Sequence, residues 1–167
     1  MTEPQPQLPP SLLIACYAEA RRTYPREACG LLCGRRGAMA IDTLRVCEND
    51  QDRLHALDPL GFPRDGRTAF RLRFVDVLWL YESLQTDVPA RILFHSHVDV
   101  GAAFSAQDRV EAQRHDVLRE TFDHLVVDVS ADGARGALRY RFVDGDFRCI
   151  ARYDAQGRFL QVDSGTS

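Results

Sequence analysis

Two histidines one residue apart, followed by a serine and an aspartate, occur in the segment HSHVDVGAAFSAQD at residues 95–108. Side chains at positions i and i+2 of a β-strand point to the same face of the sheet. His95 and His97 therefore present two imidazoles together at the end of the apolar run RILF, and the loop that follows is long enough to fold Asp108 back onto them. Three such protein ligands are expected where zinc keeps a fourth position open for water, whose pKa it lowers to about 7. The pattern predicts a zinc hydrolase.

A zinc-bound water also needs a group that takes and returns its proton. Glu27, in YPREACGLL just before a predicted buried strand, is the best candidate for this base. The sequence alone does not bring Glu27 beside His95. Each part of the pattern also has an ordinary structural interpretation. Glu27 can be a solvated carboxylate, and the two histidines can be ordinary surface or core residues. SAQD can be a helix capping box, with Ser105 as N-cap and Asp108 at N3. The joint pattern is less expected by chance than any of its parts.

The elements that must position these residues follow from the apolar periodicity. We expect helices over residues 11–24, 74–85 and 105–122. We expect strands in a hairpin over 29–49, a short edge strand at 68–73, a buried strand at 90–97, and strands at 124–130, 137–145 and 146–154, the last two joined by an Asp-Gly turn. Strands joined mostly by hairpins and flanked by three helices indicate an α/β fold, a mixed sheet with helices on its faces.

One domain accounts for the 167 residues. We expect it to span residues 11–155, after a flexible lead-in at 1–10 and before a C-terminal tail at 156–167. Residues 48–67 are polar and interrupted by proline and glycine. Loops of this length are uncommon in compact domains and are often functional or mobile.

Charge and cysteine content bear on partners and compartment. The formal net charge is −3 with acids and bases interspersed, so no basic stripe indicates a nucleic-acid partner. No apolar run approaches the length of a membrane span, and MTEPQPQLPP lacks the features of a signal peptide. The five scattered cysteines suit buried thiols in a reducing compartment, with Cys29, two residues from Glu27, the one that could take part in chemistry. We therefore expect a cytoplasmic protein; its oligomeric state stays open, with a homodimer among the options.

The chemical residues together resemble a known family. A glutamate upstream, then His-x-His, seven residues, serine, two residues and aspartate is similar to the pattern of the JAMM (MPN+) zinc metallopeptidases, and residues 95–108 fit that spacing. PREACGLLCG resembles the family's glutamate-bearing segment, and DGDFRCI resembles the closing strand pair of its short bacterial members. The likeness runs from about Ser11 to Tyr153.

The resemblance implies a mixed, mainly antiparallel curved sheet flanked by helices, a three-layer sandwich like that of cytidine deaminases. It assigns His95, His97 and Asp108 to one zinc ion per chain. It assigns Glu27 to the general acid and base that activates water, and Ser105 to stabilisation of the oxyanion.

Two positions depart from the family pattern. Members usually carry proline after the second histidine and before the serine, where this chain has Val98 and Phe104. Both prolines would stiffen the loop, so we expect a more mobile or substrate-adapted loop here. Neither change removes a ligand or a catalytic group.

The resemblance further implies hydrolysis of the amide or isopeptide bond after the C-terminal tail of a ubiquitin-like protein. For a short bacterial member, this partner is a sulfur-carrier protein or a ubiquitin-like modifier with a glycine-ended tail. Such a tail would add itself to a sheet edge. The predicted edge strand is the natural place for it, which makes Arg67, Thr68, Ala69 and Phe70 the candidate substrate-binding residues. An inert surface loop is the alternative for this segment.

Other function classes fit the sequence less well. A catalytically inactive binding scaffold of the same fold usually lacks the ligand set, which is complete here. A nucleobase deaminase would need His-x-Glu and a later Pro-Cys-x-x-Cys, and neither is present. A small-molecule zinc amidase would share the metal site and differ only in substrate.

Overall fold

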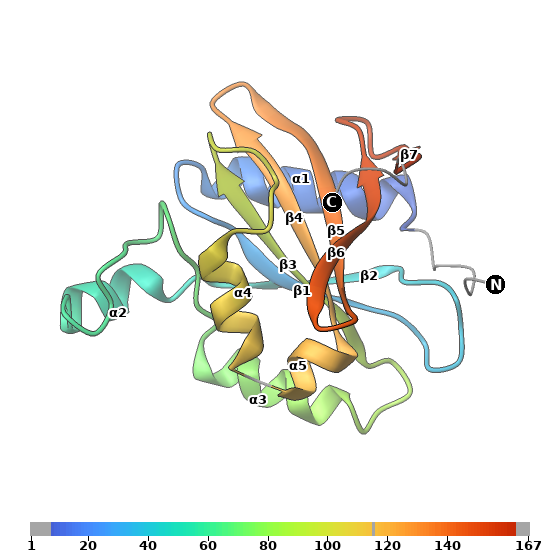
Figure 1. Cartoon of the computed structure of the whole chain (residues 1–167), viewed down its shortest axis with the longest axis horizontal. Helices are drawn as coiled ribbons and strands as arrows, with labels where there is room; N and C mark the ends of the chain where they lie inside the picture. The colour runs from blue at the N-terminus through green and yellow to red at the C-terminus, as the bar shows by residue number, and fades with distance from the viewer. Residues whose placement is uncertain (1–7, 115, 163–167) are drawn as a thin grey trace.

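A seven-stranded sheet, covered by helices on both faces, forms the body of the computed structural model, which describes residues 8–114 and 116–162 (Figure 1). Helix α1 covers one face, and α3 and α4 pack on the other. The helices are α1 Pro10–Thr23, α2 Gln51–Leu57, α3 Phe74–Ser83, α4 Ala106–Gln113 and α5 Asp116–Thr121. The strands are β1 Cys29–Cys33, β2 Thr43–Cys47, β3 Ala90–Val98, β4 Asp123–Ser130, β5 Gly133–Val143, β6 Asp146–Tyr153 and β7 Phe159–Leu160.

The sheet order is β2-β1-β3-β4-β5-β6-β7, and every neighbouring pair is antiparallel except β3 and β4, which run parallel. This mixed, mainly antiparallel α/β architecture confirms the predicted fold class. Strand β3 lies between β1 and β4, so the end that carries the histidines is flanked by a paired strand on each side.

Alternation along the central strands separates two apolar layers. Ile92 and Phe94 of β3 pack with Leu13 and Cys16 of α1, in the core on one face of the sheet. Leu93 points the other way, toward a smaller cluster that includes residues of α3. A third cluster, between α4 and the strands β4 to β6, is rich in aromatic rings. The residues that follow Leu93 at the same parity therefore face α3 and α4.

Several predicted elements are confirmed with small changes. The hairpin of β1 and β2 and the Asp144-Gly145 turn between β5 and β6 are present, the two turn residues having φ of 51° and 86°. All five cysteines are free, and all but Cys149 are buried. Across the described residues, none of the helices combines the length and apolarity needed to span a bilayer.

Three expectations need correction or remain open. The polar segment 48–67 is not wholly a loop, because α2 lies within it. The helix expected over 105–122 is described as two segments, α4 and α5, on either side of residue 115, which lies outside the described residues. The lead-in and tail fall partly outside them too, at 1–7 and 163–167, while β7 lies within the expected tail. The domain limits stay a prediction.

Candidate metal centre

Strand β3 carries both histidines on one face, as its period of two requires. His95 and His97 share the parity of Leu93 and point away from α1, and only 1% and 6% of their surfaces are exposed. Ser96, between them, turns to the other side, where its hydroxyl accepts a hydrogen bond from the Ala28 amide at 2.8 Å. The predicted pairing of the two imidazoles is therefore present at the end of the strand.

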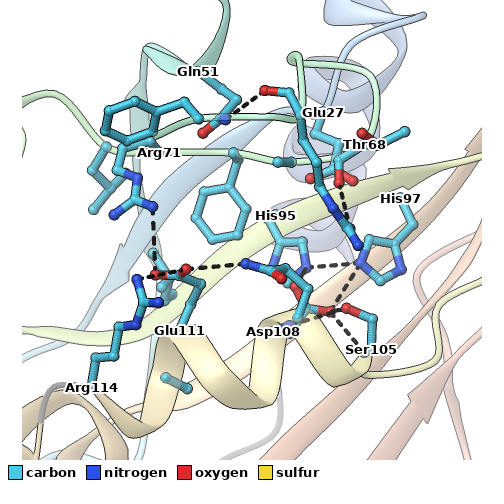
Figure 2. Close-up of a pocket in the computed structure, with 18 of the residues that line it drawn as sticks. Glu27, Gln51, Thr68, Arg71, His95, His97, Ser105, Asp108, Glu111 and Arg114 are labelled. Carbon is cyan, nitrogen blue, oxygen red and sulfur yellow. Dashed lines mark hydrogen bonds and ion pairs between the residues drawn. The ribbon is translucent and has the colours of Figure 1, made fainter. Parts of the chain in front are cut away.

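The imidazoles and the Asp108 carboxylate converge through specific atoms (Figure 2). The two Nε2 atoms lie 3.1 Å apart. Asp108 Oδ1 lies 3.3 Å from His95 Nε2, and Oδ2 lies 3.1 Å from His97 Nε2. His97 Nδ1 lies 3.2 Å from the Gly101 carbonyl oxygen, which can only accept, so that nitrogen carries the proton of the neutral ring and leaves the Nε2 lone pair facing inward.

This arrangement fits a bound cation. One ligand atom from each of His95, His97 and Asp108 lies within 4.8 Å of the others, so the group could bind a metal ion. Two ring nitrogens facing each other beside a carboxylate repel unless a proton or a metal ion lies between them. Two imidazole nitrogens and one carboxylate oxygen form a donor set that suits zinc.

Electrostatics at the two rings differ. Complete burial lowers the pKa of His95. Burial acts in the same direction on His97, but Asp108, Glu27 and the Gly101 carbonyl outweigh it and raise the His97 pKa above its usual value. A proton therefore competes with a metal ion mainly at His97.

Glu27 reaches the site through the register of β1 against β3. Cys29 pairs with His95, and the Ser96 amide donates to the Ala28 carbonyl at 3.0 Å, so the antiparallel register continues to bring Glu27 beside His97. Glu27 is 5% exposed and lines the same cavity as the two histidines. The pairing of β1 with β3, two strands far apart in the sequence, brings Glu27 to the histidines. Sequence periodicity alone could not predict this placement.

The Glu27 carboxyl has the protonation behaviour of an acid and base that works near neutral pH. Burial raises its pKa to about 8; Asp108 adds to the rise, while His97 and Arg64 oppose it. A catalytic group is most effective when its pKa lies near the working pH. Such a shifted carboxyl in a cavity is typical of functional sites.

Ser105 and Asp108 form the complete capping box of α4. The Asp108 amide donates to the Ser105 hydroxyl oxygen at 3.1 Å, while the Ser105 amide and hydroxyl donate to Asp108 Oδ2 at 2.8 and 2.7 Å. Burial would raise the pKa of Asp108, but the two imidazoles and Ser105 hold it far below its usual range. The capping interpretation and the convergence on the histidines therefore hold for the same carboxylate.

The expected edge strand at residues 68–73 is not formed. Among the residues the structure describes, this segment contributes one β-bridge, between Leu72 and Asn49. The Asn49 side chain takes the place of a ladder: its amide donates to the carbonyls of Glu27 and Ala69 at 3.0 and 3.1 Å, and its oxygen accepts from the Arg71 amide. Asn49 thereby fixes this segment against the start of β1.

The cavity next to the histidines has a volume of about 460 Å³. Of the four candidate substrate residues, Thr68, Ala69 and Phe70 line it and Arg67 does not. The Phe70 ring stacks on His95, with centroids 4.5 Å apart and planes at 19°. Phe70 therefore contacts His95, a candidate metal ligand. No sequence pattern indicated this contact.

Phe104 fixes the loop between β3 and α4. Its ring is 6% exposed and lies between those of His124, Tyr140 and Phe147, at centroid distances of 5.1, 5.1 and 4.7 Å. Phe104 stands where the related family pattern has proline. The packing of its aromatic ring therefore constrains the backbone next to Ser105, in place of the fixed backbone angle that a proline would supply. His115 lies outside the described residues.

Solved structures share this fold at low sequence identity. A protein from Salinibacter ruber aligns with a TM-score of 0.57 and 17% identity, over 96% of this chain and 94% of its own. A protein from Desulfitobacterium hafniense aligns with a TM-score of 0.56 and 19% identity, over 86% and 88%.

Relatives with higher sequence identity indicate the family of this chain. Proteins named CysO-cysteine peptidase, from Mycobacterium tuberculosis and Mycobacterium bovis, are 31% identical to this chain over 137 residues, which is 80% of each sequence. A family profile described as prokaryotic homologs of the JAB domain matches residues 9–139, which include all five predicted catalytic and metal-binding residues. The chain therefore belongs to the family of prokaryotic JAB-domain proteins.

Proposed function

We propose that this protein is a zinc-dependent metallopeptidase that hydrolyses the amide bond after the C-terminal tail of a ubiquitin-like protein. The convergence of His95, His97 and Asp108 on one point, with Glu27 beside them in the same cavity, carries this proposal. Three protein ligands leave a fourth position for water or substrate, which is the arrangement of catalytic zinc sites.

The chain's own residues have distinct roles in this reaction. Zinc, held by His95, His97 and Asp108, would supply a hydroxide nucleophile at neutral pH and polarise the scissile carbonyl. Glu27 accepts the proton of the attacking water and then, as an acid with a raised pKa, gives it to the leaving amine nitrogen. The Ser105 hydroxyl is the candidate donor to the oxyanion, for which it would turn from Asp108 toward the reacting carbonyl.

Family membership and the mycobacterial relatives support a ubiquitin-like partner of the sulfur-carrier or modifier type. In our proposal its glycine-ended tail lies along residues 67–70, where Thr68, Ala69 and Phe70 line the cavity. Glycine fits such a position because a residue without a side chain lets the backbone approach the metal ligands closely.

Metal content and activity test this proposal together. The wild-type protein should hold about one zinc per chain by mass spectrometry, and His97→Ala should lose both zinc and hydrolysis. Glu27→Gln keeps the shape of the side chain and removes its acid–base function, so it should retain zinc and lose turnover. A wild-type protein that binds no zinc after supplementation would favour the binding scaffold, and turnover by Glu27→Gln would remove Glu27 from the mechanism.

A further inference from the structure

The cavity has two charged ends (Figure 2). At one end Arg71 and Arg114 flank Glu111, with nitrogen–oxygen distances of 3.6 and 3.1 Å, so these arginines already have a carboxylate partner. At the other end lie Glu27 and Thr68. The end near Glu27 is where the bond is cut in the proposed function.

Arg64 places a positive charge at the Glu27 end. Its carbonyl accepts a hydrogen bond of 2.7 Å from the amide of Gln51, a buried residue of α2, which fixes the backbone at this point. Its side chain lines the cavity and donates to the Thr68 carbonyl at 3.4 Å. Two residues further on, the Gly66 carbonyl accepts a hydrogen bond of 2.6 Å from the Glu27 amide, so the segment that carries Arg64 lies against Glu27. Unlike Arg26 and Arg53, which pair with Asp52 and Asp50, Arg64 forms no ion pair within 4 Å among the described residues.

The chemistry of the leaving group indicates what this guanidinium can bind. Because Glu27 gives its proton to the leaving nitrogen, that nitrogen must lie at the Glu27 carboxyl. In a single C-terminal residue, the free α-carboxylate is attached to the same carbon as this nitrogen. In an isopeptide the nitrogen ends a lysine side chain, and no carboxylate lies beside it. A cation next to Glu27 is therefore matched to the first substrate and not to the second.

Resting on the proposed function, we infer that Arg64 is a specificity-determining residue that binds the free α-carboxylate of the leaving amino acid. The enzyme would thus select ubiquitin-like proteins extended by one C-terminal residue over isopeptide-linked or longer chains. Arg64 would act on binding and orientation of the leaving residue and take no part in proton transfer.

The expected change in kcat/KM is that of one charge-assisted hydrogen bond between Arg64, an exposed arginine, and the substrate carboxylate. Hydrogen bonds to charged groups contribute enough to change an equilibrium or a rate about 10- to 100-fold. We therefore expect wild-type kcat/KM for a free-acid substrate to exceed that for its carboxamide by about this factor.

The test uses the zinc-loaded full-length chain and three ligated substrates. Each is a bacterial sulfur-carrier protein ending in Gly-Gly, extended by alanine with a free carboxylate, by alanine carboxamide, or by the side chain of a lysine peptide. Arg64→Gln should lower kcat/KM for the free acid about 10- to 100-fold and leave the carboxamide unchanged, while Arg64→Lys should keep part of the preference. Arg35→Gln, at an exposed turn away from the cavity, controls for loss of charge.

Each outcome separates this inference from the function on which it rests. A wild-type enzyme that cuts the free acid and the carboxamide equally well would refute carboxylate binding while keeping the peptidase. An equal loss on both substrates in Arg64→Gln would assign Arg64 to the tail or the transition state instead. Failure of the zinc-loaded wild type on all three substrates would overturn the proposed function itself.

Discussion

Removal of the Phe104 ring should destabilise the protein strongly, although the related family pattern has proline there. The ring is 6% exposed and contacts three aromatic neighbours, so Phe104→Ala leaves a cavity between β4, β5 and β6. Such truncations of buried phenylalanine cost about 3–5 kcal/mol. For a domain of this size, 1 kcal/mol corresponds to roughly 2–4 °C, so Tm should fall by about 6–20 °C.

Thermal unfolding of matched variants measures this effect. Phe74→Ala is the control, because Phe74 is 76% exposed and its truncation should change stability by no more than about 0.5 kcal/mol. Phe104→Pro, which restores the family residue, should also lose stability, since proline cannot fill the space between the rings. If Phe104→Ala lowers Tm no more than Phe74→Ala, in protein treated with chelator as well as zinc-loaded protein, the aromatic anchor does not hold this loop.

Two further predictions concern rings near the metal centre. Burial lowers the pKa of His124 to about 4. Between that value and the unfolded value near 6.5, the unfolded chain binds a proton that the native chain does not, so stability should fall by about 3 kcal/mol as pH drops from 7 to 4. The measurement is urea unfolding of His124→Phe at several pH values with chelator present, and there this part of the stability loss should vanish. If stability depends on pH in the variant as it does in the wild type, the low pKa does not belong to His124. Phe70→Leu removes the ring stacked on His95 and should weaken zinc binding about tenfold in a competition titration, whereas the exposed change Phe159→Leu should not.

The sequence predicted what depends on local periodicity. The i and i+2 spacing placed His95 and His97 on one face, and the capping box correctly marked the start of α4 at Ser105. These features need only neighbouring residues, so a strand period and a hydrogen-bonding preference suffice to find them.

Contacts between distant segments could not be predicted in this way. Glu27 lies beside His97 because β1 pairs with β3. The register of this pair depends on how α1 and the hairpin of β1 and β2 pack against β3. Residues 67–73 have the composition of a strand, but the side chain of Asn49 takes up the backbone hydrogen bonds that a ladder would use. β-propensity describes a fit to a half-buried surface, so tertiary contacts decide whether a strand forms.

Ser105 has two roles to separate, because its hydroxyl now orients Asp108 and is also the candidate oxyanion donor. Ser105→Ala should cost about 1 kcal/mol of stability through loss of the cap. If the hydroxyl acts on the oxyanion, kcat should fall about 100-fold while zinc affinity stays unchanged, since one such donor contributes about 3 kcal/mol to the barrier. If it acts by holding the Asp108 carboxylate, zinc affinity should fall in parallel with kcat, and saturating zinc should restore turnover. Zinc titration and kinetics of this one variant therefore assign the hydroxyl to one role or the other.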